Sequence, residues 1–149
     1  MDKLQWDDSL NINVLDLDEK MQHFFSVLNR FFEFQSIKKK KEEDYDAILE
    51  VFADLAEYVN FHFKHEEMIL SQHFYPEYKQ HQKEHQRFVK RMLGYRRLFS
   101  DEPEKAYNDA VKYSREWIMN HVKQDDVRYA PFVRVQKHLN DHKVPRKKR

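Results

Sequence analysis

Cysteine is absent from the 149 residues of this chain, glycine occurs once, and proline occurs four times. Without cysteine, the protein can form no disulfide and offers no thiolate for a metal site or for nucleophilic catalysis. So few glycines and prolines exclude a turn-rich β-sheet protein, because most tight hairpins need glycine. The composition therefore predicts an all-α fold.

Long apolar runs are also missing. No stretch of the sequence approaches the roughly 20 apolar residues that are needed to cross a bilayer. The first residues, Met1 to Leu4, contain no hydrophobic signal region. The lack of cysteine fits a reducing compartment. We therefore expect a cytoplasmic protein without a membrane span.

Basic residues are unevenly distributed, although the net charge is only +1. Of the 27 lysines and arginines, four stand at 38–41 and five within 143–149, which leaves 18 against 26 acidic residues. Nucleic-acid binding needs a basic face on the folded body, so we expect no nucleic-acid partner for it. We predict one domain over 1–142 and a disordered basic tail over 143–149, with tail contacts to nucleic acid or anionic lipid as the alternative.

Large aromatic residues are plentiful, with 12 Phe, 8 Tyr and 2 Trp, and they supply a core despite a mean hydropathy of −0.98. Apolar residues recur at three- and four-residue steps in four segments. They predict helices over about 18–37 and through 48–69, 78–95 and 106–121, with a charged connection before the second. An extended N-terminal arm over 1–17 and a short C-terminal helix complete an up-down-up-down four-helix bundle.

Polar side chains interrupt the apolar faces of three of these predicted helices. A spacing of four residues places two side chains one above the other on a helix, so such a pair can aim at one point. The six interrupting residues are His62, Glu66, His81, His85, His121 and Asp126. Burying them without partners would cost several kcal/mol each, and a metal satisfies imidazoles and carboxylates together. We therefore predict two metal ions bridged by Glu66 and Asp126.

Other residues provide a comparison for these six, since a single histidine on an apolar face is more often a hydrogen-bonded core residue than a ligand. Four histidines that lie off the apolar faces or in links are predicted to be on the surface, namely His65, His73, His138 and His142. Trp6 and Trp117 are predicted core residues. Tyr129 is predicted either to donate a hydrogen bond to a metal ligand or simply to pack.

Several blocks of the chain resemble the hemerythrin family, in particular its single-domain bacterial members. They are Trp6 twelve positions before Asp18, His62-Phe63-Lys64-His65-Glu66-Glu67, Tyr75-Pro76 with His81 and His85, and Trp117-Ile118-Met119-Asn120-His121 with Asp126 and Tyr129. Together they cover about residues 6–130 with no long insertion. The resemblance implies a four-helix bundle that encloses a non-haem di-iron centre and binds dioxygen.

The resemblance also implies a role for each of the six residues. By position, His81, His85 and His121 would hold one iron, and His62 would belong to the other. Glu66 and Asp126 would bridge the two ions beside an oxo or hydroxo group.

The chain departs from the family pattern in its first helix. The family reads Ile-Asp-x-Gln-His, whereas this chain reads Leu17-Asp18-Glu19-Lys20-Met21, so a methionine stands where the remaining histidine ligand belongs. His23 is the alternative ligand, but it lies about 200° around the helix from Met21. A thioether suits copper(I) better than non-haem iron, so we predict that Met21 is a core residue. The second ion would then be held more weakly and would be more open to added ligands.

Three functions follow from this reading, and the first is the one that we predict. It is a dioxygen-binding protein rather than an enzyme, and its ligand is dioxygen or a related diatomic molecule or peroxide. The alternatives are an oxidase-like or peroxidase-like scavenger and a sensor module whose metal state is recognised by a separate partner. A helical domain that binds no metal is the simplest hypothesis. Imidazole and carboxylate ligands suit iron, manganese and zinc alike, and a protein partner for delivery is unknown.

Overall fold

The structure analysed is a computed structural model, and the residues that it describes are 3–6, 8–11 and 15–141. Within this part, the side chains of 15–16, 125–127, 136–137 and 140–141 lie outside the description. The predicted basic tail at 143–149 and His142 also lie outside the described residues, so the predicted domain boundary stays a prediction.

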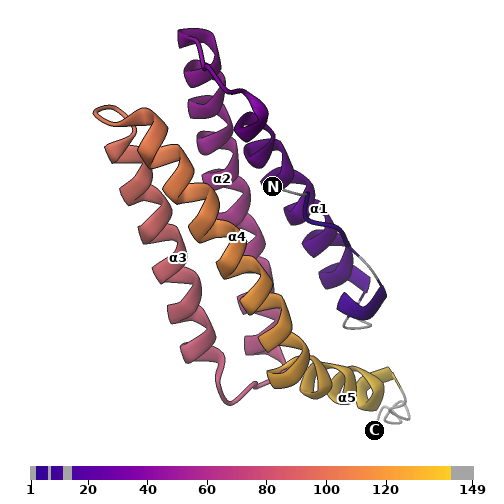
Figure 1. Cartoon of the computed structure of the whole chain (residues 1–149). Coiled ribbons are helices and arrows are strands. Elements are labelled where there is room, and N and C mark those ends of the chain that lie inside the picture. The colour runs from indigo at the N-terminus through magenta and orange to yellow at the C-terminus, as the bar shows by residue number, and fades with distance from the viewer. Residues whose placement is uncertain (1–2, 7, 12–14, 142–149) are drawn as a thin grey trace, which may run out of the picture.

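Helices account for all the regular structure in the described part of the chain. They are the 3₁₀ helix η1 (Asp8–Leu10), α1 (Leu15–Phe32), the 3₁₀ helix η2 (Glu33–Ser36), α2 (Glu42–Gln72), α3 (Tyr78–Leu98), α4 (Pro103–Arg128) and α5 (Ala130–Asp141). The four long helices α1 to α4 run alternately up and down, and α5 turns away at the lower end of the bundle (Figure 1). The predicted four-helix bundle with a short C-terminal helix is therefore confirmed.

Local chemistry accounts for where these helices begin. α2 begins at Glu42, inside the segment predicted to be a charged connection, because the Asp44 carboxylate accepts a hydrogen bond from the backbone N–H of Lys41 at 2.8 Å. Acidic residues in a first turn also stabilise the positive end of the helix dipole. α4 begins with Pro103, whose missing N–H costs nothing at that position. The break around Pro76 separates α2 from α3, as predicted.

Large apolar side chains fill the upper half of the bundle. Phe31 and Phe52 meet edge to face at 4.7 Å between ring centroids, and the Tyr107 hydroxyl donates a 2.6 Å hydrogen bond to the carbonyl of Phe31. The N-terminal arm is tied to α1 because the Asn29 side chain bonds both the N–H and the C=O of Leu4 at 2.8 Å. The apolar stripes read from the sequence therefore meet in one core.

Both tryptophans pack against this core, as predicted. The ring of Trp6 lies edge-on to Phe25 with 5.3 Å between centroids, and Trp117 lies 4.3 Å from the ring of Phe88. Each tryptophan is partly buried, so each covers the core at its margin.

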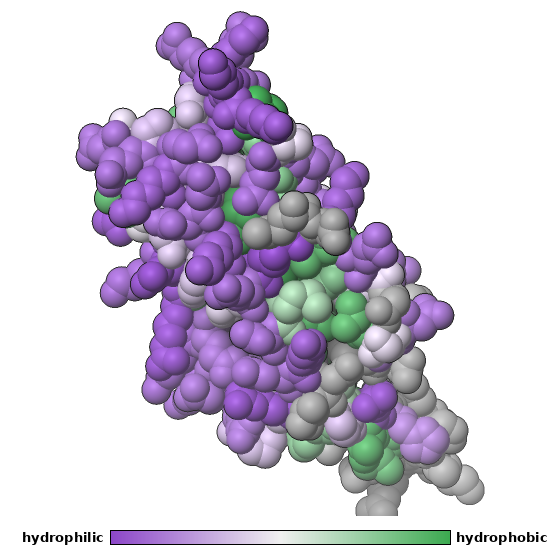
Figure 2. Space-filling model, in the orientation of Figure 1, coloured by the Kyte–Doolittle hydropathy of each residue, from purple (hydrophilic) through white to green (hydrophobic). Residues whose placement is uncertain are grey.

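Hydrophilic side chains cover most of the face shown in Figure 2, with apolar side chains in a band on the right and at the lower end. None of the helices in the described part of the chain combines the length and the apolar character that a membrane crossing requires. The lower half of the bundle interior differs from the upper half, because buried polar side chains gather there.

Candidate metal centre

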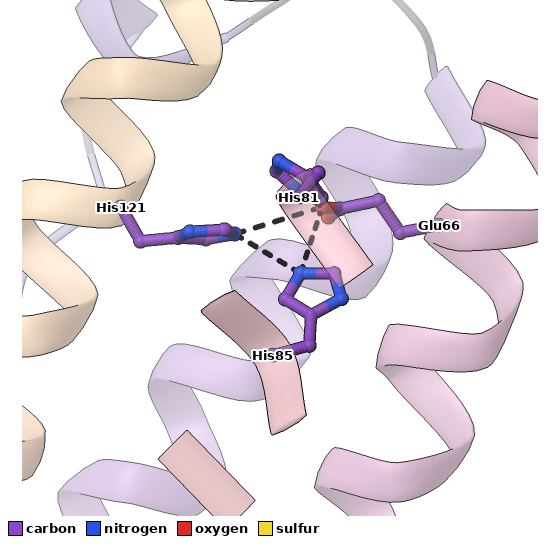
Figure 3. Close-up of side chains that lie close together, drawn as sticks. All are labelled: Glu66, His81, His85 and His121. Atoms are coloured by element: carbon purple, nitrogen blue, oxygen red, sulfur yellow. Dashed lines mark hydrogen bonds and ion pairs between the residues drawn. The ribbon is translucent and has the colours of Figure 1, made fainter. Parts of the chain in front are cut away.

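Four buried polar side chains from three helices meet in the bundle interior. Glu66 comes from α2, His81 and His85 come from α3, and His121 comes from α4 (Figure 3). Each offers one ligand atom, and these four atoms all lie within 4.8 Å of one another. The structure thus brings together four of the six residues predicted to bind metal.

The ligand atoms converge on one oxygen of Glu66. Its Oε1 lies 3.2 Å from Nε2 of His85 and 3.6 Å from Nε2 of His121, and it also contacts Nε2 of His81. The two nitrogens of His85 and His121 are 3.3 Å apart. Three imidazole nitrogens and one carboxylate oxygen aimed at a common point form a donor set that suits zinc, iron or manganese.

Helix spacing and aromatic packing position these rings. His81 and His85 are one turn apart on α3, with 4.4 Å between their ring centroids. Each of the three imidazoles has an aromatic neighbour, which limits its rotation. Phe63 stacks on His85 at 3.8 Å and 4°, Trp117 stacks on His121 at 4.4 Å and 14°, and Tyr129 lies edge-on to His81 at 5.2 Å.

Two further carboxylates contact the outer nitrogens of these histidines. Glu67 Oε2 lies 3.0 Å from Nδ1 of His85, and Glu84 Oε2 lies 3.8 Å from Nδ1 of His121. Arg128 holds the other oxygen of Glu84 at 3.1 Å. When a metal binds, a carboxylate hydrogen-bonded to Nδ1, as Glu67 is to His85, keeps the ring proton there and leaves Nε2 able to coordinate, which is how most metal-binding histidines are oriented.

Charges within the cluster suit a cation. Burial acts to raise the pKa of Glu66, but contacts from His121 and His81 outweigh it and hold that pKa well below its usual range. Burial lowers the pKa of His121 to about 4, with Glu66 opposing the shift. The pKa of His85 is raised, because contacts with Glu66 and Glu67 outweigh the opposing effect of burial. Near neutral pH, the cluster therefore contains an ionised carboxylate and at least one neutral imidazole.

His62 occupies the opposite side of the same carboxylate. Its Nε2 lies 3.7 Å from Oε2 of Glu66, and the residue is 1% exposed. Among the residues that the structure describes, neither ring nitrogen of His62 has a hydrogen-bond partner. Burial lowers the pKa of His62 to about 4, so the ring is neutral. A buried neutral imidazole with both nitrogens lacking a hydrogen bond fits a metal ligand, since an ion would compensate the buried lone pair.

The remaining predicted residues have different outcomes. Asp126 belongs to α4, but its side chain is outside the described residues, so its bridging role stays a prediction. Met21 is buried in the core, as expected. His23 is exposed, and its ring lies edge-on to Tyr58 with 4.6 Å between centroids. The alternative that His23 replaces the missing ligand is therefore not supported, because His23 is exposed and does not belong to the group of converging ligand atoms.

The comparison histidines that the structure describes, His65, His73 and His138, lie outside the cluster. His138 is exposed, as predicted, whereas His65 and His73 are half-buried. Tyr129 is buried and its ring lies edge-on to His81, and the choice between packing and hydrogen bonding stays a prediction. Sequence reasoning missed Glu67 and Glu84, although each stands directly beside a predicted ligand in the chain. That adjacency is the signal that could have found them.

A small cavity lies against Glu66 on the side of α1. Its volume is about 10 Å³, which is room for about one water molecule. The lining residues are Trp6, Leu10, Leu17, Asp18, Met21, Glu66, Val122 and Tyr129. Glu66, which is a predicted metal ligand, and Met21 of α1 therefore line the same cavity.

Comparisons with known proteins agree with this geometry. A family model described as "Hemerythrin HHE cation binding domain" matches residues 17–133. The chain is 30% identical to a bacteriohemerythrin of Stenotrophomonas maltophilia over 92% of this chain and 84% of the relative. It is 28% identical to a bacteriohemerythrin of Pseudomonas aeruginosa over 90% of this chain and 84% of the relative. A bacteriohemerythrin of Clostridium acetobutylicum is 26% identical over 83% of this chain and 96% of the relative.

Proposed function

This chain belongs to the hemerythrin family of cation-binding proteins, and we propose that it is a non-haem di-iron protein that binds dioxygen for carriage, storage or delivery. The observation that carries this proposal is the convergence of three Nε2 atoms on one oxygen of Glu66 in the bundle interior. Bound iron would supply the redox-active centre at which dioxygen is held.

The two oxygens of Glu66 support a bridging role for its carboxylate. Oε1 faces the three histidines of α3 and α4, whereas Oε2 faces His62. We propose that His81, His85 and His121 hold one iron and that His62 belongs to the other. Glu66 and Asp126 would bridge them, with an oxo or hydroxo group completing the centre.

The chain's own residues keep this centre oriented and dry. Glu67 would hold a proton at Nδ1 of His85 so that Nε2 of this ring can coordinate, and the Glu84 carboxylate lies 3.8 Å from Nδ1 of His121. Phe63 and Trp117 cover the faces of the same two rings and restrict the entry of water. Such exclusion strengthens electrostatic interactions in the site and limits side reactions of a bound oxygen ligand.

Met21 makes the second iron position atypical. A thioether is a soft ligand that suits non-haem iron poorly, so we propose that it does not coordinate. The second iron would then have one imidazole, from His62, plus the bridging carboxylates. We expect this iron to be held more weakly than the first.

Metal analysis combined with absorption spectroscopy tests the proposal. The protein is loaded with ferrous iron without oxygen, its iron content per chain is measured, and the spectrum is recorded before and after admission of air. We expect up to two irons per chain and absorption bands that appear in air and reverse when oxygen is removed. Iron-loaded protein without a reversible spectral change would contradict dioxygen binding, and failure to retain iron would contradict the iron assignment.

A further inference from the structure

Met21 lines the small cavity beside Glu66, and the surroundings of this methionine are unusually polar for a core thioether. The same cavity is lined by the acidic residues Asp18 and Glu66 and by Tyr129. Asp18 is 8% exposed and Glu66 is 1% exposed, so both acidic groups are buried. The lining residues Trp6 and Leu10 are partly exposed, so the cavity lies close to the surface under the N-terminal arm.

Met92 provides a matched comparison within the same chain. Met21 and Met92 are both 7% exposed, and each lines a small cavity, of about 10 Å³ and 20 Å³. The cavity of Met92 is lined by apolar side chains together with Arg96. Burial and residue type are thus the same at the two sites, whereas carboxyl groups are present beside Met21 alone.

We propose that the cavity beside Glu66 takes hydrogen peroxide and that the sulfur of Met21 is the site that this peroxide oxidises. Hydrogen peroxide is close to water in size and both donates and accepts hydrogen bonds. The carboxyl groups of Asp18 and Glu66 can accept bonds from it. The cavity of Met92 is lined by no acidic residue, so peroxide finds no carboxylate acceptor there to replace its hydration.

The reaction is a two-electron oxygen transfer. A sulfur lone pair attacks one peroxide oxygen, the O–O bond breaks, and the proton of the attacked oxygen passes to the leaving oxygen. The products are methionine sulfoxide and one water molecule, so the thioether is oxidised and the peroxide is reduced. No metal takes part in this step, so the inference does not depend on the iron assignment.

Oxidation would change the character of the cavity. A sulfoxide replaces an apolar thioether with a polar S–O group, and this group would lie beside the Glu66 carboxylate. The second side of the carboxylate would thereby gain an oxygen donor that the reduced chain lacks there. The modification site is therefore adjacent to the proposed metal centre and is distinct from its ligands.

Peptide mass spectrometry tests the proposal on the full chain, both as isolated and after removal of metal with a chelator. The protein is treated with hydrogen peroxide, the reaction is stopped with catalase, and oxygen addition is timed separately at Met21, Met92 and the 48% exposed Met68. We expect Met21 to oxidise at least about fivefold faster than Met92 in metal-free protein. Equal rates at these two residues, or a faster rate at Met92, would overturn the proposal.

A pair of cavity-filling variants sharpens the test. Val122→Ile adds one methyl group to the cavity of Met21, and Val89→Ile adds one to the cavity of Met92. We expect the first variant to slow oxidation of Met21 without changing Met92, and the second to leave Met21 unchanged. An undiminished rate at Met21 in Val122→Ile would show that peroxide does not act from this cavity and would overturn the proposal.

Two further measurements distinguish the effect of the cavity from the effects of unfolding and of metal content. A misfolded variant would oxidise Met92 as fast as the exposed Met68, so the ratio of these two rates reports folding in the same sample. Iron content is measured independently. Failure to bind iron would contradict the proposed function while leaving the comparison of Met21 with Met92 intact.

Discussion

Glu66 divides the bundle interior into two unequal sides. On the side of α3 and α4, three histidines face its Oε1 atom, and each imidazole has an aromatic neighbour. On the side of α1, His62 Nε2 lies 3.7 Å from its Oε2 atom, and Glu66 and Met21 both line the small cavity. Among the described residues, one carboxylate thus borders a donor-rich side with three imidazoles and a donor-poor side with one imidazole.

The difference shows that preorganisation depends on the neighbours of a ligand as much as on the ligand itself. Glu67 is within hydrogen-bond distance of Nδ1 of His85 and Glu84 lies 3.8 Å from Nδ1 of His121, whereas neither ring nitrogen of His62 has a hydrogen-bond partner among the described residues. A ligand whose outer nitrogen is already held loses less freedom when a metal binds. We therefore expect the first ion to bind on the α3 and α4 side.

The largest expected effect is the acid sensitivity of the metal-free protein. Folding lowers the pKa of both His62 and His121 from 6.5 to about 4, chiefly through burial. Between these pH values the unfolded chain binds protons that the folded chain does not, so the free energy of unfolding falls as the pH falls from 6.5 to 4. Each ring accounts for about 3 kcal/mol of this loss, at 1.36 kcal/mol per pKa unit.

Urea denaturation across this pH range measures the effect. Because the raised pKa of His85 acts in the opposite direction, the informative quantity is the difference between the wild type and His62→Leu. We expect the variant to lose about 3 kcal/mol less stability than the wild type between pH 6.5 and 4. The exposed His138→Ala is the control. Parallel pH curves for the wild type and His62→Leu would contradict this prediction.

Removing a ligand from the donor-rich side is expected to have the next largest effect. His121→Ala should lower the affinity for the first zinc ion by more than about 100-fold, since loss of an outer partner alone costs about 10- to 100-fold. His62→Leu should change that affinity by less than about tenfold, because His62 lies on the other side of Glu66. Competition with a chromophoric chelator measures both values. An equal loss in the two variants would contradict the inequality of the two sides.

The outer carboxylates should contribute a smaller amount. Glu67→Gln should lower the affinity for zinc by about 10- to 100-fold, and Glu84→Gln should lower it less, because its contact is 3.8 Å rather than 3.0 Å. The exposed Glu116→Gln on α4 is the matched control. The same chelator competition applies. If Glu67→Gln binds zinc as tightly as Glu116→Gln, the proposed orientation of His85 is wrong.

The smallest expected effect comes from adding a donor to the donor-poor side. Met21→His should raise the affinity for a second ion by roughly tenfold, which corresponds to about 1.4 kcal/mol. Stepwise titration with ferrous iron, followed by metal analysis, separates the second ion from the first. Met92→His is the control, since that buried position lies away from the cluster. An unchanged second-ion affinity would show that Met21 does not limit this position.

Much of the fold and part of the site were predictable from periodicity. Apolar steps of three and four residues located α1 to α4, because a helix must present one apolar face to the core. The same spacing placed His81 and His85 on one face and pointed to His62 with Glu66. These features depend only on the spacing of residues within a single helix, and that spacing can be taken from the sequence alone.

Features that depend on several helices were not predictable in this way. Glu84 stands on α3 but contacts His121 and Arg128 of α4, and a single-helix pattern cannot show such contacts. The first helix was expected to extend to about residue 37, but α1 ends at Phe32 and the chain continues as the 3₁₀ helix η2. Helix ends depend on local hydrogen bonding, which changes within one or two residues.

The parallel stacking of Trp117 on His121 gives the protein a built-in optical reporter. The chain has two tryptophans, and the other one, Trp6 of the N-terminal arm, lies instead against Phe25. Light emitted by the indole of Trp117 arises 4.4 Å from an imidazole of the cluster. Occupation of that imidazole by an iron ion will quench this emission, so the fluorescence of the unlabelled protein will follow loading of the centre in real time.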